Sequence, residues 1–256
     1  MKVVAFLAGL PALLLTPIAS HPADYRGVSV SVGAEYTSGK YGGANSTEIT
    51  YLPVSLKYQA NDTSFRVTVP YLSVTSTGFV ETESGVVGSG SAQRTTESGL
   101  GDVTGAVTQT VVSDSGNKFF VDVTAKIKFP TADANAGLGT GKADYMAQVG
   151  IWKDFDRIAT FAGAGYKVVG SPAGVALRNV LSGYFGASYK VAPATTASLI
   201  ADVGQSTIAG RETKRLLTGE LAYRVTDSVR IRGYVLKGFS TSSPDYGGGV
   251  TLSYSF

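Results

Sequence analysis

Few residues of this chain have the chemistry that enzymes use for nucleophilic attack or proton transfer. The chain has no cysteine and a single histidine, His21, which lies close to the N-terminus. A serine or cysteine nucleophile needs an activating base, most often histidine. Two carboxylates can hydrolyse glycosides, but no acidic pair stands apart from the other charged residues. The sequence therefore predicts no enzyme, no cofactor and no metal site.

One glycine-rich stretch resembles a phosphate-binding loop. Residues 137–142 read GLGTGK. In a P-loop, a glycine stands five residues before the GK pair, a serine or threonine follows the lysine, and a helix comes next. Here Ala136 occupies the first position, Ala143 follows Lys142, and no helical pattern is present. We therefore expect no nucleotide site.

Charged side chains instead recur at every second position of apolar segments. In residues 119–129, for example, Asp122, Lys126 and Lys128 alternate with aromatic and aliphatic residues. Alternate side chains of a β-strand point to opposite faces of its sheet, so such charges share one face. We predict that this face lines the lumen of a barrel and carries fourteen charged residues: Glu35, Lys57, Arg66, Asp102, Asp122, Lys126, Lys128, Asp144, Lys167, Asp202, Glu220, Arg224, Arg230 and Arg232.

Such an inner face has two interpretations. Opposite charges could pair and fill the lumen, because charges removed from bulk water need partners or water. Alternatively, part of the set could line a watery path and select solutes, with its basic members favouring anions. A tight turn at 226–227 joins the two strands that carry Glu220 and Arg232. We predict that Glu220 lies within ion-pair reach of Arg232 or another inward cation.

The elements that must position these residues are strands. Alternation of period two predicts about twelve of them, and no sustained helical period occurs. Short and longer connections follow one another in turn, which is typical of a transmembrane β-barrel. The predicted fold is therefore all-β, a transmembrane antiparallel up-and-down β-barrel. The predicted strands lie near residues 26–37, 47–60, 63–74, 100–112, 118–129, 143–153, 157–169, 178–190, 195–205, 213–225, 228–240 and 245–256.

Aromatic residues and composition agree with this prediction. Charged residues make up 16% of the chain, below the quarter that is usual in soluble proteins. Aromatic residues cluster at the predicted strand ends, as in the girdles of outer-membrane barrels. Those beside the short turns are Tyr58, Phe65, Phe119, Tyr189, Tyr223, Tyr254 and Phe256, and those beside the long loops are Tyr36, Tyr71, Phe129, Tyr145, Tyr166 and Tyr246.

Both ends of the chain carry separate signals. Residues 1–20 have a positive start, an apolar stretch and a small-residue exit, which predicts a signal peptide. Residues 21–256 would then form the barrel. Residues 247–256 alternate up to Phe256, which predicts a closing strand. This ending also resembles the C-terminal signal that the barrel assembly machinery reads, so we expect that machinery as a partner.

Three motifs resemble one known family. They are SGLGDVT at 98–104, FPTADANAGLGTGKADY at 129–145 and SPDYGGGVTLSYSF at 243–256. Together they resemble the family of outer-membrane proteins named for the meta pathway of phenol degradation. The resemblance extends from about Ser98 onward and implies a small barrel with a suspected transport role. The turn PTAD departs slightly from the family pattern, in which a glycine is commoner.

Two function classes remain open, with outer-membrane lipid as a partner in each. One is a channel or facilitator for small solutes, with aromatic or anionic solutes as candidates; the solute itself is unknown. The alternative is a structural or adhesive barrel with a sealed lumen and partner-binding loops, such as the long loop 75–99. A secreted β-sandwich is a weaker third option. With a net charge of +3 and no basic stripe, nucleic acid is not an expected partner.

Overall fold

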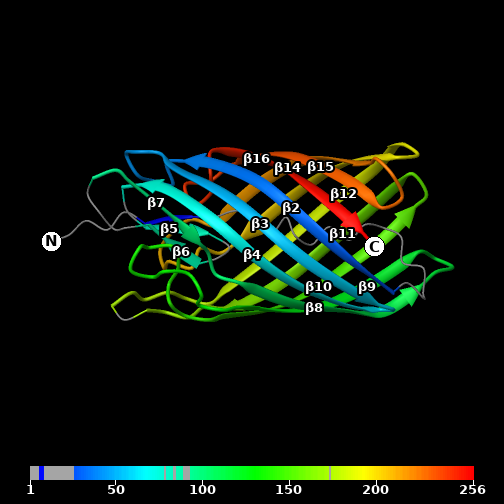
Figure 1. Cartoon of the computed structure of the whole chain (residues 1–256), viewed down its shortest axis with the longest axis horizontal. Coiled ribbons are helices and arrows are strands. Elements are labelled where there is room, and N and C mark those ends of the chain that lie inside the picture. The colour runs from blue at the N-terminus through cyan, green and yellow to red at the C-terminus, as the bar shows by residue number, and fades with distance from the viewer. Residues whose placement is uncertain (1–5, 9–25, 78, 83–84, 89–92, 173) are drawn as a thin grey trace.

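The computed structural model describes residues 6–8, 26–77, 79–82, 85–88, 93–172 and 174–256. Long antiparallel strands form a barrel (Figure 1). Twelve strands form the wall: β2 (Arg26–Gly39), β3 (Thr47–Ala60), β4 (Thr63–Ser76), β8 (Thr104–Asp114), β9 (Phe119–Lys128), β10 (Asp144–Phe155), β11 (Ile158–Val168), β12 (Val180–Ala192), β13 (Thr195–Gly204), β14 (Lys214–Arg224), β15 (Val229–Gly238) and β16 (Tyr246–Ser255). The predicted fold class, a transmembrane antiparallel up-and-down barrel of about twelve strands, is confirmed.

The barrel closes between the first and the last of these strands. β16 pairs antiparallel with β2, from Tyr246 opposite Ser38 to Ser255 opposite Ser29. Each wall strand also pairs with its neighbour in sequence, so the sheet returns on itself. Beyond the end of β16, the Phe256 amide donates to the Val28 carbonyl at 2.9 Å. Closure matters because an unpaired strand edge in lipid would leave backbone groups without hydrogen bonds.

The two faces of the wall differ as the alternation predicts. On β10, for example, Val149 and Ile151 are exposed on the outside, whereas Gln148, Gly150 and Trp152 are buried on the inside. Exposed valine, leucine, isoleucine and aromatic side chains recur around all twelve strands. In water such a surface would be unfavourable, but it matches the outward apolar band of a barrel that spans a membrane.

The two ends of the barrel have different connections (Figure 1). Short turns join the strands at one end, where β16 ends, and the long loops lie at the other. At the short-turn end, Asn61 and Asp156 have positive φ angles of 52° and 68°, a conformation that asparagine and aspartate tolerate better than most residues. Barrels of this class place short turns in the periplasm and long loops outside the cell.

The structure differs from the sequence prediction in the region of the long loop 75–99. β4 continues to Ser76, and a short strand, β7 (Thr95–Leu100), pairs with its C-terminal part, from Tyr71 to Ser76. β8 pairs with the N-terminal part of β4, from Thr63 to Thr68, and begins only at Thr104. Residues 101–103 interrupt the wall there because Asp102 turns inward to a buried lysine, as described below.

A second, three-stranded sheet lies at the long-loop end (Figure 1). It consists of β1 (Phe6–Ala8), β5 (Phe79–Thr82) and β6 (Gly85–Val87), in the order β1-β5-β6. β1 falls inside the segment predicted as a signal peptide, residues 1–20, whose other residues lie outside the described part of the chain. The signal peptide stays a prediction, and its removal would leave β5 and β6 as a hairpin.

Candidate functional site

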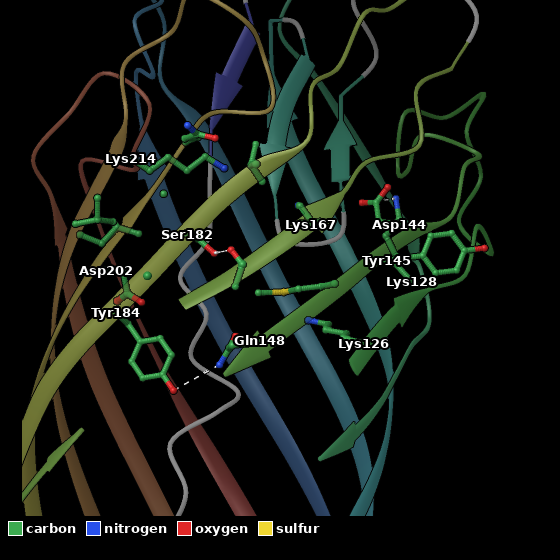
Figure 2. Close-up of a pocket in the computed structure, with 18 residues that line it drawn as sticks. Lys126, Lys128, Asp144, Tyr145, Gln148, Lys167, Ser182, Tyr184, Asp202 and Lys214 are labelled. Carbon is green, nitrogen blue, oxygen red and sulfur yellow. Dashed lines mark hydrogen bonds and ion pairs between the residues drawn. The ribbon is translucent and has the colours of Figure 1, made fainter. Parts of the chain in front are cut away.

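The lumen contains two cavities that meet at one pair of side chains. The inner cavity lies toward the short turns, and the outer cavity lies toward the long loops. Gln148 and Tyr184 border both. Gln148 Nε2 donates to the Tyr184 hydroxyl at 3.5 Å, as Figure 2 shows. This pair therefore forms a polar waist between the cavities.

Five cations and four carboxylates border the inner cavity, and four of the cations stand in like-charged pairs. Lys57 stands directly opposite Arg66 on the paired strands β3 and β4. Likewise, Arg224 stands opposite Arg230 on β14 and β15. Like charges in such positions repel and are normally destabilising. Seven of the residues predicted to line the lumen border this cavity: Glu35, Lys57, Arg66, Asp122, Arg224, Arg230 and Arg232.

The outer cavity is mainly basic. Figure 2 shows lysines from β9, β11 and β14 around it. Lys214, which the sequence analysis did not single out, joins Lys126, Lys128 and Lys167 there. The predicted residues that border this cavity are Lys126, Lys128, Asp144, Lys167 and Asp202. That these residues act on a solute stays a proposal, to which we return below.

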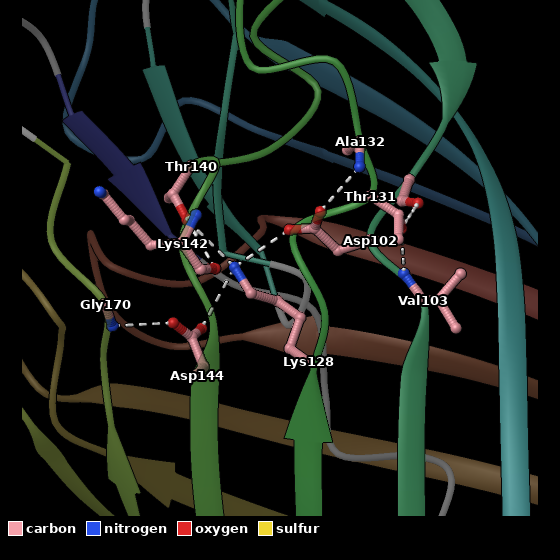
Figure 3. A network of polar contacts seen from close by, with 10 residues as sticks. Asp102, Val103, Lys128, Thr131, Ala132, Thr140, Lys142, Asp144 and Gly170 are labelled. Atoms are coloured by element: carbon pink, nitrogen blue, oxygen red, sulfur yellow. Dashed lines mark hydrogen bonds and ion pairs between the residues drawn. The ribbon is translucent and has the colours of Figure 1, made fainter.

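A buried ion cluster lies beside the outer cavity (Figure 3). Lys128 Nζ is 3.0 Å from Asp102 Oδ2, 3.4 Å from Asp144 Oδ2 and 3.2 Å from Thr140 Oγ1. All three charged side chains are at most 4% exposed. The second oxygen of each carboxylate accepts from a backbone amide, Ala132 N at 2.9 Å and Gly170 N at 3.0 Å. Buried charges require such partners.

This cluster fixes the loop that follows β9. The loop, residues 129–143, contributes Ala132 and Thr140 to the cluster and returns directly into Asp144. Gly139 allows the loop to pass close to Asp102, since a Cβ there would lie 2.9 Å from Asp102 Oδ2. Gly141 has a φ of +64°, which a residue with a side chain would rarely adopt. These two glycines therefore allow the loop to follow its path around the cluster.

The same loop carries apolar side chains into a cap at the outer end of the barrel. Leu138 packs with Ile49 from β3, Leu72 and Val74 from β4, and Val87 from β6. These side chains are at most 2% exposed. A Cβ on Gly99 would lie 2.7 Å from Leu138 Cδ1, so this glycine makes room for the leucine. We call this cluster the loop cap; it covers the outer end beside β3 and β4.

Glu220 and Arg232 lie where the sequence analysis predicts. Glu220 is directly opposite Tyr234, and Arg232 Nε lies 3.6 Å from Glu220 Oε2. The Glu220 side chain is 4% exposed and the Arg232 side chain 19%. The distance is that of an ion pair and slightly too long for a hydrogen bond. The predicted pair, and with it the inner-face register of this hairpin, is confirmed.

We expect Arg232→Ala to destabilise the barrel more than Arg232→Gln. The alanine leaves the Glu220 carboxylate buried without a partner, a change that costs about 1–3 kcal/mol or more. Glutamine keeps a donor near the carboxylate. Urea unfolding of the two variants in lipid vesicles measures the difference. Equal unfolding free energies for both variants would contradict it.

An aromatic cluster that the sequence did not indicate lies on the inner face. The rings of Trp152 and Phe161 stack with centroids 4.5 Å apart, and Tyr184 lies 6.3 Å from Phe161. A Cβ on Gly163 would meet the Tyr184 ring at 2.5 Å, so the glycine makes space for that ring. The glycines of FAGAG at 161–165 were the available signal, because Gly163 and Gly165 share a face with Phe161 and leave room there for rings from neighbouring strands.

No group of three or more His, Cys, Asp or Glu side chains in the described part of the chain could hold a metal ion. No described helix is long and apolar enough to cross a membrane.

A comparison with family models decides the relationship that the three motifs indicate. Residues 25–256 match the model described as "Putative MetA-pathway of phenol degradation". The chain belongs to this family. The match covers the whole described barrel, including the first three strands, which the motifs did not reach. Among curated protein sequences, none matches the chain.

Solved structures with a similar fold include a channel, a porin and the transport unit of an autotransporter. An outer membrane channel from Pseudomonas putida F1 has a TM-score of 0.75 at 13% identity and covers 94% of this chain and 99% of its own. The NanC porin has a TM-score of 0.55 at 13% identity and covers 89% and 98%. The transport unit of the autotransporter AIDA-I from Escherichia coli reaches 0.57 at 13% identity, covering 96% and 94%. At these identities the likeness concerns the fold.

In this member of the phenol-degradation family, two motifs converge on the ion cluster. SGLGDVT supplies Gly99 and Asp102, and the stretch at 129–145 supplies Leu138, Gly139 and Asp144. The motif residues therefore fasten the loop cap and its ion cluster to the wall, which is a structural role. They lie beside the outer cavity, and the solute is not readable from them.

Proposed function

We propose that the chain is an outer-membrane channel through which small solutes diffuse, with anions preferred over cations. The observation that carries this proposal is the basic excess on the inner face. Five cations border the inner cavity, with Glu35 and Asp122 on the strands and Asp62 and Asp227 at the short turns; the cations are Lys57, Arg66, Arg224, Arg230 and Arg232. The outer cavity adds four lysines against Asp144 and Asp202, so the cations outnumber the acids along the lumen. Charge of one sign along a narrow, low-dielectric path concentrates the counter-ion.

Two further observations support this proposal. The two cavities meet at a polar waist rather than at an apolar barrier. The similar structure from Pseudomonas putida F1 is that of an outer membrane channel. Because the chain shares the fold of channels and porins and holds no histidine beyond His21, we further propose that it is not an enzyme.

One observation favours the alternative of a sealed, structural barrel. The loop cap fills part of the outer end with side chains that are almost wholly buried. If the loop cap stays closed, the lumen forms no continuous path, and the loops would serve to bind partners.

Single-channel recording in planar bilayers distinguishes an open channel from a sealed barrel. We expect discrete conductance steps from the purified, folded barrel and a reversal potential that favours chloride over potassium. Arg66→Gln with Arg230→Gln should weaken the anion preference, because both side chains border the inner cavity. Absence of steps from a correctly folded barrel would support the sealed barrel, and cation preference would contradict the role of the basic wall.

The outer-membrane location has its own test. The folded barrel should fractionate with the outer membrane and change its electrophoretic mobility on heating. A chain that stays folded and monomeric in the aqueous phase without detergent would contradict the location.

A further inference from the structure

Two cations point away from the lumen into the lipid-facing surface. Arg215 on β14 is exposed next to buried Leu216, and Lys237 on β15 is exposed next to buried Leu236. The alternation of each strand therefore turns both charged side chains outward, onto the face that carries exposed Leu217. Charge on this face is unfavourable near the bilayer midplane and tolerated close to the interface.

The strand register places these two cations side by side. Lys237 stands directly opposite Leu217, and the Phe239 amide donates to the Arg215 carbonyl at 2.9 Å. Arg215 is thus the diagonal neighbour of Lys237 on the same face. Diagonal neighbours on paired strands lie roughly 7–8 Å apart at their backbones, within reach of long side chains. Arg215 and Lys237 can therefore contact one small group together.

Their height on the barrel matches the outer edge of the membrane. Lys237 pairs with Tyr246, a member of the aromatic girdle beside the long loops that is 55% exposed. Phe239, two residues beyond Lys237, is 56% exposed. Interfacial aromatic rings mark the level of the headgroups. Since the long loops face the outside of the cell, this level is that of the outer leaflet.

The Glu212 carboxylate offsets the charge of Arg215 in part and leaves that of Lys237. The Glu212 carboxylate accepts hydrogen bonds from the Thr241 amide and hydroxyl, both at 2.8 Å. The Thr241 amide and hydroxyl, with a smaller contribution from Arg215, hold the pKa of Glu212 below its usual value. Among the described residues, Lys237 has no ion-pair partner.

Other outward charges at the strand ends are already satisfied. Glu48, at the long-loop end of β3, pairs with Arg94 at 2.8 Å. Lys153, at the short-turn end of β10, donates to the Asn117 carbonyl and lies 5.7 Å from the centre of the Phe155 ring. The pair formed by Arg215 and Lys237 differs because it combines two neighbouring cations, an apolar surround and the outer-leaflet level.

We propose that Arg215 and Lys237 form a binding site for a phosphate group of the glycolipid of the outer leaflet, lipid A. Arginine binds phosphate through two parallel hydrogen bonds, and lysine adds a point charge. The acyl chains of the same lipid would lie along the exposed surface below, which includes Val235 at 69% and Val203 at 45% exposure. The proposal rests on the outer-membrane location put forward above, but not on transport.

Binding of lipid A to the purified full barrel in detergent micelles tests this proposal. The probes are lipid A with both phosphates and the same lipid with its phosphates removed, measured by native mass spectrometry. We expect the wild-type barrel to bind the phosphorylated form more tightly. Arg215→Gln with Lys237→Gln should weaken that binding by about twenty-five-fold, on the basis of roughly fivefold per interfacial cation.

A matched control is Lys153→Gln, which removes an outward cation at the opposite rim and should leave binding unchanged. Phosphate-free lipid should bind the wild type and the double variant equally. The proposal is overturned if wild type does not distinguish the two lipids, or if the double variant keeps the wild-type affinity.

Heat-modified mobility confirms that each variant is folded, and conductance of the double variant should match wild type. Loss of conductance in every sample would count against the proposed channel and leave the lipid result standing.

Discussion

Lys128→Ala should lower the unfolding free energy of the barrel by about 3–5 kcal/mol, the range for removing one partner of a buried ion pair. The variant leaves two carboxylates, Asp102 and Asp144, buried at the outer end without their shared cation. Their remaining amide hydrogen bonds come from Ala132 and Gly170 and cannot neutralise two charges. The loop 129–143 should then detach, because its return is fixed at this cluster.

Two measurements check this result. Urea unfolding in lipid vesicles gives the loss of stability, and limited proteolysis from the long-loop side shows whether the loop has become accessible. If the lumen is a channel, the variant should also conduct more than wild type, because the loop cap includes Leu138 from the same loop.

The matched control is Lys142→Ala, which removes an exposed lysine from the same loop. It should leave stability and proteolysis unchanged. Asp102→Asn keeps the shape of the cluster with one charge fewer and should give a smaller loss. Wild-type stability for Lys128→Ala would show that water reaches the cluster and that the buried contacts matter little.

Deleting Phe256 should nearly abolish the yield of folded barrel in the outer membrane. In the structure, this residue contributes one backbone bond to Val28 and a ring contact with Tyr254 at 4.8 Å. It is 74% exposed, so the loss of folded-state contacts should cost only about 1–2 kcal/mol. A far larger effect on yield is expected because the ending resembles the signal that the assembly machinery reads.

The variant Phe256→Tyr separates the two contributions. It keeps an aromatic ring at the end of β16 and should assemble normally. Refolding of the deletion variant from urea into detergent should also succeed, since that process needs no assembly machinery. Outer-membrane yield equal to that of wild type would refute the role of Phe256 as a signal.

The fold was readable from the sequence because alternation has a direct physical cause. On β2, serines that face the lumen require the alternate valines to face lipid, and the strand has this alternation at residues 28–32. The closing strand was readable for the same reason. The length of β4 and the presence of β7 were not, since the residues that extend the wall there are polar and lie in a region rich in threonine, serine and glycine.

The candidate site was only partly readable. Glu220 and Arg232 could be paired by counting from a tight turn, because register follows from turn length in a hairpin. The ion cluster could not be found in this way. Asp102 lies between β7 and β8, Lys128 ends β9, and Thr140 comes from the loop 129–143 that encloses them. Such contacts depend on the path of a long loop, which local periodicity does not describe.

The closure between β2 and β16 also constrains how the protein folds. The hydroxyls of Ser31 and Ser253 are 2.8 Å apart although 222 positions separate them along the chain. Contacts between such distant segments slow folding, because the entropy of closing a large loop is lost before the contact forms. During synthesis, β2 emerges with its apolar face long before its final partner exists. The polypeptide must therefore stay unfolded and protected until its last segment arrives, so a nascent fragment without β16 should aggregate or be degraded.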